Sequence, residues 1–156
     1  MLHSFSTLQI LQTDIDTAWK FMSSPKNLAN ITPSYMGFTI IGHEDQFTEM
    51  YSGQLIEYTV TPVLGLKMNW VTEITHVSEK QYFVDEQRFG PYAFWHHKHF
   101  LRAVDSGVEM IDIVHYKIPF GFLGKIANTL FIQKKLQEIF DYRYTALEAM
   151  FTIKSK

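Results

Sequence analysis

The sequence contains no cysteine among its 156 residues. A disulfide framework, a thiolate zinc site and a cysteine nucleophile are therefore excluded. The first residues, 1–5 (MLHSF), lack both the basic start and the continuous apolar core of a secretory signal. We therefore expect a cytoplasmic protein.

An excess of charge of one sign is also missing. The chain has 14 Lys and Arg against 16 Asp and Glu, a formal net charge of −2. This balance offers no field that would concentrate nucleic acid, so we expect no nucleic-acid partner. The most apolar late stretch, Phe120 to Ile132, contains Lys125 and is too short to span a bilayer, so we expect no transmembrane segment.

Motifs for nucleotide and serine chemistry are absent as well. The chain has no GxGxxG, no Walker-type loop and no GxSxG elbow. We expect no cofactor. Aromatic residues, by contrast, are plentiful, with 13 Phe, 8 Tyr and 3 Trp. At this length the chain fits one domain, residues 1–156, with wide rings available to line a cavity.

Turn residues and periodicity predict an α+β order of elements. A strand over 3–12 precedes a helix for which Thr13-Asp14-Ile15-Asp16 offers an N-cap and acidic residues in the first turn. A second short helix begins with Ser24 as cap and Pro25 at its first position. Six strands fit between Phe38 and Pro119, since turn residues interrupt this span at regular intervals. One long helix follows over 121–153, with an inward stripe of Ile126, Leu130, Gln133, Leu136, Phe140, Tyr144, Leu147 and Phe151.

The strand pair 93–103 and 107–117 has a predictable register. A two-residue turn at Asp105-Ser106 pairs Val104 with Gly107 and places His99 opposite Asp112. The even-numbered face of the second strand carries fewer charges, so it is inward, and its partner's odd-numbered face is inward with it. The expected inward residues are Ala93, Trp95, His97, His99, Leu101 and Ala103, together with Val108, Met110, Asp112, Val114, Tyr116 and Ile118.

The same alternation assigns two earlier strands. The expected inward residues there are Ile56, Tyr58 and Val60, followed by Leu66, Met68, Trp70, Thr72 and Ile74. For the strand 81–89 alternation does not distinguish the two faces, because both mix aromatic, apolar and charged residues.

Several short motifs, taken in order, resemble one superfamily. They are Ser24-Pro25, Ile31-Thr32-Pro33, the segment 83–87 (FVDEQ), Gly90-Pro91-Tyr92, Trp95, His97, His99 and the segment from Asp112 to Pro119. This pattern is similar to the START-like (SRPBCC, Bet v 1-like) superfamily, in its polyketide cyclase/dehydrase-like or cell-division-inhibitor-like branch. The resemblance implies a helix-grip fold, in which a curved seven-stranded antiparallel sheet wraps a long C-terminal helix and two short helices follow strand 1.

The resemblance also implies a function and some site residues. Such folds bind lipids, polyketides and other small hydrophobic molecules between the sheet and the long helix. The pattern places Asp85 and Gln87 towards the cavity. The expected ligand-binding residues are Tyr58, Trp70, Trp95, His97, His99, Met110, Asp112 and Tyr116, with Met36 and Phe122 as gates.

His97, His99 and Asp112 are the candidates for chemistry. A histidine facing a carboxylate can be held in one tautomer with a raised pKa, as a general acid or base requires. The same contact also suits a buried structural pair. His96 points away from its neighbours, and although two same-face histidines with Asp112 could form a two-His-one-carboxylate set, we expect no metal.

Three functions stay open at this point. The first is a binding module that carries, senses or sequesters a hydrophobic ligand whose polar end lies near His97, His99 and Asp112. The second is a cyclase or dehydratase-type enzyme with His99 as base. The third is an interaction module, in which outward residues form a homodimer or partner surface if they prove contiguous; these residues are Phe94, Phe100, Ile111 and Ile113.

Overall fold

The computed structural model of the protein describes residues 1–42, 49–61, 65–119, 121 and 131–152. The N-terminal half contains β1 (His3–Leu11), α1 (Ile15–Met22), two 3₁₀ helices η1 (Pro25–Ile31) and η2 (Ser34–Met36), β2 (Thr39–Ile41) and β3 (Gln54–Val60). The C-terminal half contains β4 (Met68–Ser78), β5 (Tyr82–Phe89), β6 (Phe94–Val104), β7 (Gly107–Lys117) and α3 (Gln133–Phe151). The predicted α+β order, with six strands between residues 38 and 119, is confirmed.

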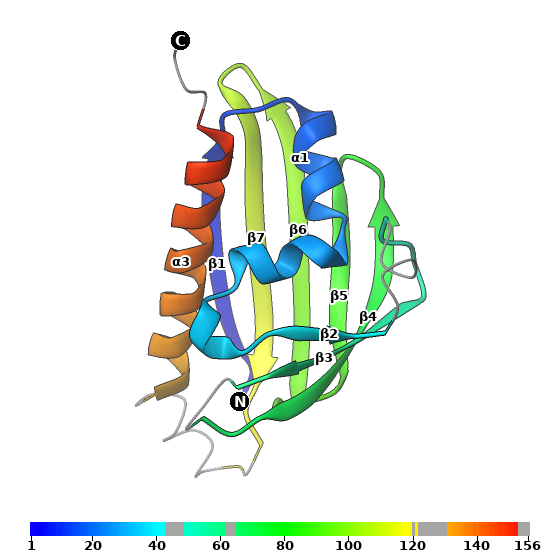
Figure 1. Ribbon diagram of the computed structural model, residues 1–156, viewed down its shortest axis with the longest axis vertical. Coiled ribbons are helices and arrows are strands. Elements are labelled where there is room, and N and C mark those ends of the chain that lie inside the picture. Colours follow the sequence, from blue (N-terminus) through cyan, green and yellow to red (C-terminus); the bar gives the residue numbers. More distant parts are fainter. Residues whose placement is uncertain (43–48, 62–64, 120, 122–130, 153–156) are drawn as a thin grey trace.

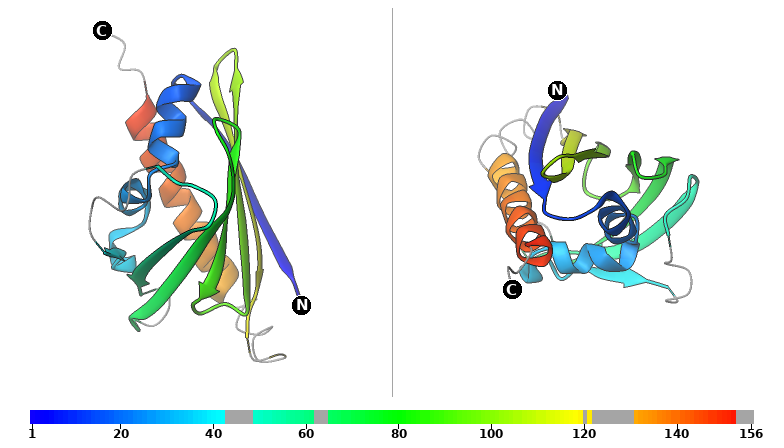
Figure 2. Two further views of the ribbon diagram at one scale, coloured as in Figure 1. Left: turned by 90° about the vertical axis from the view of Figure 1, so that its right-hand side faces the viewer. Right: turned by 90° about the horizontal axis from the view of Figure 1, so that it is seen from above.

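The seven strands form one antiparallel sheet in the order β1-β7-β6-β5-β4-β3-β2. The sheet is curved, and its concave face holds α1, η1 and α3 (Figures 1 and 2). Among the described helices only α3 is long enough to run along the sheet, whereas α1 and η1 cover the part of the concave face that α3 leaves open (Figure 1). The helix-grip arrangement expected from the sequence is therefore present.

The short helices begin where the sequence indicates. Asp14 caps α1, because its Oδ1 accepts a hydrogen bond from the Thr17 amide at 2.8 Å. Ser24 occupies the cap position of η1 with Pro25 next to it, but its side chain makes no capping hydrogen bond. The predicted cap position at Ser24 is confirmed, and Pro25, which has no amide hydrogen to satisfy, follows it at the start of the helix.

The register of β6 and β7 matches the prediction. Asp105 and Ser106 form the turn, Val104 pairs with Gly107, and His99 lies opposite Asp112. Because this register places one face of both strands on the concave side, His97, His99, Leu101 and the even-numbered residues of β7 from Val108 to Tyr116 are buried. Ala93 and Ala103, predicted inward, are exposed near the two ends of β6.

The faces of β3 and β4 are mostly as predicted, with one error. Ile56, Val60, Trp70, Thr72 and Ile74 are buried. Leu66 is 64% exposed, because β4 begins only at Met68 and alternation does not apply before a strand starts.

Alternation did not show which face of β5 is inward, because buried and exposed residues do not alternate along this strand. A register shift in β4 between Ile74 and His76 interrupts the pairing, and consecutive residues Phe83 and Val84 are both buried. Asp85 lies on the cavity side of this strand, as the family resemblance implied.

The helix α3 packs on the concave face through Leu136, Phe140 and Leu147. Tyr144, predicted inward, is 44% exposed, and Arg143 takes the inward position instead. A spacing of three residues from Phe140 and four from Leu147 puts Arg143 on the buried stripe. Of the predicted helical segment before Phe131, only Gly121 lies within the described residues.

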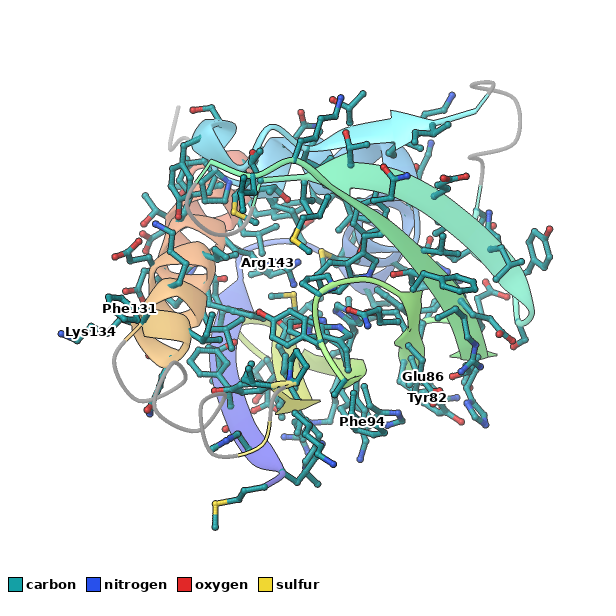
Figure 3. All side chains as sticks on the ribbon, turned by 90° about the horizontal axis from the view of Figure 1, so that it is seen from below. Tyr82, Glu86, Phe94, Phe131, Lys134 and Arg143 are labelled. Atoms are coloured by element: carbon teal, nitrogen blue, oxygen red, sulfur yellow. The ribbon has the colours of Figure 1, made fainter. Side chains whose placement is uncertain are left out.

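The convex face of the sheet carries a row of apolar side chains. Leu8 pairs with Ile111, Ile111 with Phe100, and Phe100 with Tyr82, across β1, β7, β6 and β5. Figure 3 places Tyr82 and Phe94 on this outer side of the sheet. Of the four residues in the interaction hypothesis, Phe100 and Ile111 pair with each other, whereas Phe94 pairs with Lys117 and Ile113 with Lys98. Association stays a prediction.

Candidate functional site

A cavity of about 150 Å³ lies between the concave face, η1 and α3. Its walls are mainly apolar, and four of its polar lining residues, Asp85, His97, His99 and Arg143, lie together and form what we call its polar end. The ligand-binding residues predicted from sequence that line it are Met36, Tyr58, Trp70, Trp95, His97 and His99.

Three aromatic residues from adjacent or nearby strands form one wall. Tyr58 stacks on Trp70 with ring centroids 5.8 Å apart, and Trp95 meets Trp70 edge-to-face at 5.4 Å. The polar tips of the first two are satisfied by one hydroxyl, because Thr72 Oγ1 lies 3.1 Å from Tyr58 Oη and 3.0 Å from Trp70 Nε1. The wall therefore presents ring faces and edges to the cavity, with its polar atoms already paired.

Tyr92 extends this wall from the turn between β5 and β6. Its ring lies 4.9 Å from that of Trp95, and its backbone is held by Gln87, whose Nε2 donates to Tyr92 O at 2.7 Å. Gln87 Oε1 accepts from the Tyr92 amide at 3.1 Å. The resemblance implied that Gln87 faces the cavity, and this is wrong. Gln87 instead holds the backbone of Tyr92, which does line the cavity.

The polar end consists of five side chains, which we call the polar cluster: Asp85, His97, His99, Asp112 and Arg143. Asp112 Oδ1 accepts a hydrogen bond from His97 Nε2 at 2.8 Å and lies 3.4 Å from Arg143 Nη1. Asp85 Oδ2 accepts from His99 Nε2 at 2.7 Å, while its Oδ1 accepts from the Trp95 indole at 3.2 Å. Strands β5, β6 and β7 and helix α3 thus each contribute to one buried network.

The pairing inside the polar cluster is incomplete. His99 Nδ1 lies 2.8 Å from Asp112 Oδ1, as the register argument predicted, but the angle is unsuited to a hydrogen bond. Within the described residues, His99 Nδ1, Asp112 Oδ2 and Arg143 Nε are buried without a hydrogen-bond partner. Buried polar atoms are rarely left unpaired, so the cluster has unused capacity for a polar group.

Burial and neighbouring charges separate the pKa values of the two histidines. Burial, reinforced by the adjacent His99, lowers the pKa of His97 to about 4. Burial also opposes a charge on His99, but its contacts with Asp112 and Asp85 outweigh this effect and raise its pKa. His97 is therefore neutral and His99 tends to carry the proton.

The two carboxylates remain ionised despite burial. Burial alone would raise the pKa of Asp112, but Arg143 and the two histidines hold it well below its usual value. Burial would also raise the pKa of Asp85, but His97, His99 and Trp95 together lower it. Arg143, and His99 in its protonated form, supply the positive charge that compensates these two carboxylates.

Three described residues that were predicted to bind ligand, Met110, Asp112 and Tyr116, do not line the cavity. Met110 belongs to the main apolar core, and Tyr116 packs in a separate cluster with Val114, Leu136 and Phe140. Asp112 lies behind the histidines, fully buried. Phe122, the second predicted gate, lies outside the described residues.

Two members of the polar cluster were not found by physical reasoning from the sequence. Arg143 lines the cavity and is only 8% exposed, and Figure 3 shows it pointing from α3 into the interior. The usable signal was a charged residue at inward spacing within an apolar helical stripe. Asp85 was indicated only by the family resemblance, since its strand has no regular alternation.

Comparisons with known proteins identify the fold. No family model matches the sequence, and no curated protein matches it. Among solved structures, a protein from Rhizobium leguminosarum superposes with a TM-score of 0.69 at 11% identity, covering 96% of both chains. A protein from Chromobacterium violaceum gives 0.69 at 14% identity, covering 96% of this chain and 97% of the other.

The structure of Ara h 8.0201 is also similar, with a TM-score of 0.62 at 14% identity and coverage of 96% of this chain and 99% of the other. The chain therefore shares the helix-grip fold of these structures. Among the described residues no helix combines the length and apolar character that a membrane span needs.

Proposed function

We propose that this protein binds a small hydrophobic molecule in the cavity, with the apolar body against the aromatic wall and a polar end at the polar cluster. The observation that carries the proposal is the cavity itself, which is apolar along Tyr58, Trp70 and Trp95 and has unpaired buried polar atoms at one end. The role is that of a carrier, sensor or sequestering module.

The size of the cavity narrows the ligand class. An engineered apolar cavity of about 150 Å³ is known to take up benzene, and the cavity here is about 150 Å³. A single ring or a short alkyl chain fits this volume, so we favour an aromatic ligand over a long-chain lipid. The motif resemblance to the polyketide cyclase/dehydrase-like branch supports the same ligand class.

The polar end of the ligand is expected to accept or donate hydrogen bonds at Arg143 and His99. Arg143 Nε has no partner among the described residues, and it can only donate. A hydroxyl, phenol or carboxylate oxygen would satisfy it. A purely apolar ligand would leave this atom unpaired and should bind less tightly.

Calorimetric titration with p-cresol tests this proposal. The wild type should bind one p-cresol per chain, and toluene, which lacks the hydroxyl, should bind more weakly. Trp70→Leu should reduce p-cresol affinity at least tenfold, because it removes the ring at the centre of the wall. The matched control, Phe94→Leu, changes an outward ring that is 43% exposed and should leave affinity unchanged. Equal losses in the two folded variants would contradict the proposal.

One observation supports a second candidate, acid–base catalysis on the bound molecule. Two adjacent histidines whose pKa values are displaced in opposite directions are typical of proton-transfer sites. The raised pKa of His99 suits it to donate a proton to a carbonyl oxygen, whereas the sequence had suggested a base. The neutral His97 would then accept the proton removed from the neighbouring carbon.

Proton exchange into a simple ketone tests this second candidate. Acetophenone in deuterated buffer should exchange its methyl protons faster in the presence of the protein, followed by NMR. The acceleration should disappear in His99→Gln and persist in His96→Gln, whose ring lies on the outer face against Glu86. No acceleration over buffer would leave binding alone as the function.

A further inference from the structure

We propose that Asp85, His97 and His99 form a binding site for a first-row divalent transition metal such as zinc. The three residues offer one ligand atom each, and these atoms all lie within 4.8 Å of one another at the polar end of the cavity. Two histidines and one carboxylate, with an open side facing a cavity, make a common ligand set for such metals.

One of the two distances from Asp85 to the histidines already suits a metal ion of this class, and the other is too short. His97 Nδ1 lies 3.4 Å from Asp85 Oδ2, and His99 Nε2 lies 2.7 Å from the same oxygen. Two ligand atoms of a tetrahedral ion at about 2.1 Å are roughly 3.4 Å apart. A small outward shift of His99 would open the second distance to that value.

The protonation of His97 also favours a cation at this point. The carboxylate of Asp112 can only accept, so His97 Nε2 carries the proton of their 2.8 Å hydrogen bond. In the neutral ring, Nδ1 then carries no proton and has a lone pair. This nitrogen lies 3.4 Å from Oδ2 of Asp85. Two acceptor atoms face each other with no proton between them, and a metal ion would satisfy both.

The residues behind the three ligands are those that metal sites use to fix their ligands. Asp112 Oδ1 lies 2.8 Å from the second nitrogen of both rings, His97 Nε2 and His99 Nδ1. Trp95 Nε1 donates to the other oxygen of Asp85 at 3.2 Å. Hydrogen bonds therefore hold the remaining polar atoms of His97 and Asp85, whereas His99 Nδ1 lies near Asp112 without one. A metal at His99 Nε2 would displace the proton that this nitrogen donates to Asp85.

The charge of the site would favour an anionic partner in the open position. Asp85 and Asp112 contribute two negative charges, and Arg143 with a divalent ion contributes three positive charges. One excess positive charge would remain at the end of the cavity. Hydroxide or the phenolate or carboxylate oxygen of a bound molecule would balance it.

Titration of zinc into metal-free, tag-free protein tests the site, followed by calorimetry and by the visible spectrum of the Co²⁺ form. One ion per chain should bind. Asp85→Asn and His97→Gln should abolish this binding and the Co²⁺ spectrum. Asp112→Asn should weaken zinc binding about 10–100-fold, the usual effect of removing the partner of a metal-bound histidine.

The chain offers a matched control on the opposite face of the same two strands. Glu86 and His96 form an outer pair, with Oε1 and Nδ1 2.9 Å apart. Glu86→Gln and His96→Gln should leave zinc stoichiometry and affinity unchanged. If Asp85→Asn or His97→Gln does not fold, Trp95→Phe is the alternative variant, because it keeps an aromatic ring and removes the indole donor to Asp85. This variant should also weaken zinc binding.

Two results would overturn the inference: no saturable zinc binding by the folded wild type, or binding that Asp85→Asn and His97→Gln retain. The zinc titration contains no organic ligand, so it succeeds or fails independently of the proposed function. If the wild type binds zinc but not p-cresol, the ligand proposal alone is rejected. If it binds p-cresol but not zinc, the metal site alone is rejected.

Discussion

Asp112 organises the charges of the buried end of the cavity. Its side chain is 0% exposed, and its Oδ1 contacts His97, His99 and Arg143, which reach it from β6 and α3. A buried carboxylate is stable only when such partners compensate its lost hydration. Each partner in turn depends on Asp112 for the same reason.

Asp112→Asn should therefore destabilise the fold by about 3–5 kcal/mol, because it leaves the Arg143 charge buried and uncompensated. Urea unfolding of the wild type and the variant measures this loss. Asp105→Asn, in the exposed β6–β7 turn, is the control and should change stability very little. Adding Arg143→Met to Asp112→Asn should recover part of the loss, and a purely additive double mutant would contradict the coupling.

The two histidines predict a bell-shaped dependence of stability on pH in the metal-free protein. The pKa of His97 is about 4 when folded and 6.5 when unfolded, so the unfolded state binds more protons in this window and stability rises with pH. The pKa of His99 is raised above 6.5, so the folded state binds more protons there and stability falls as pH rises through that value. The lowered pKa values of Asp85 and Asp112 act only below about pH 4.

Free energies of unfolding in urea, measured with chelator from about pH 4 to pH 9, should pass through a maximum near pH 6.5. The acid side should fall by roughly 3 kcal/mol, the equivalent of the His97 shift. His97→Gln should flatten the acid side and His99→Gln the alkaline side. His76→Gln, on the exposed part of β4, should change neither. A stability that keeps rising above pH 7 would be incompatible with the raised pKa of His99.

The helix α3 closes the cavity through a narrow stripe. Leu136, Phe140 and Leu147 contact the sheet, and Arg143 between them reaches the polar cluster. The same helix thus supplies both the cover of the core and the positive charge of the site.

Leu147→Ala should cost about 2–5 kcal/mol, because Leu147 is fully buried and its truncation leaves a cavity. Chemical unfolding monitored by circular dichroism measures it. Met150→Ala, one turn on and 44% exposed, is the control and should cost less than about 0.5 kcal/mol. Similar losses at the two positions would mean that the inward stripe of α3 is misplaced.

These elements also show how far the sequence alone could reach. The β6–β7 register followed from one two-residue turn, and this turn was enough to place His97, His99 and Asp112 on the same face. The site residue Asp85 did not follow from alternation, because a register shift in the neighbouring β4 disturbs the pattern. Arg143 was missed because a stripe of apolar residues was sought, whereas the site needs a charge within it.

At the scale of the whole molecule, the curvature of the sheet creates the cavity. The seven strands bend around α3, and the helix fills only part of the concave side (Figure 2). The three tryptophans of the chain differ in whether they line this cavity. Trp70 and Trp95 line the cavity, while Trp19 lies on α1 outside its lining, with its indole donating to Glu49 at 2.8 Å.

The indole N–H signals of the three tryptophans therefore give the most direct test of a ligand in this cavity. In a ¹H–¹⁵N NMR titration with p-cresol, the signals of Trp70 and Trp95 should move together and saturate at one equivalent. The Trp19 signal should stay in place and acts as an internal control. Equal movement of all three signals, or movement of Trp19 alone, would contradict the central claim that the cavity between sheet and helix is the binding site.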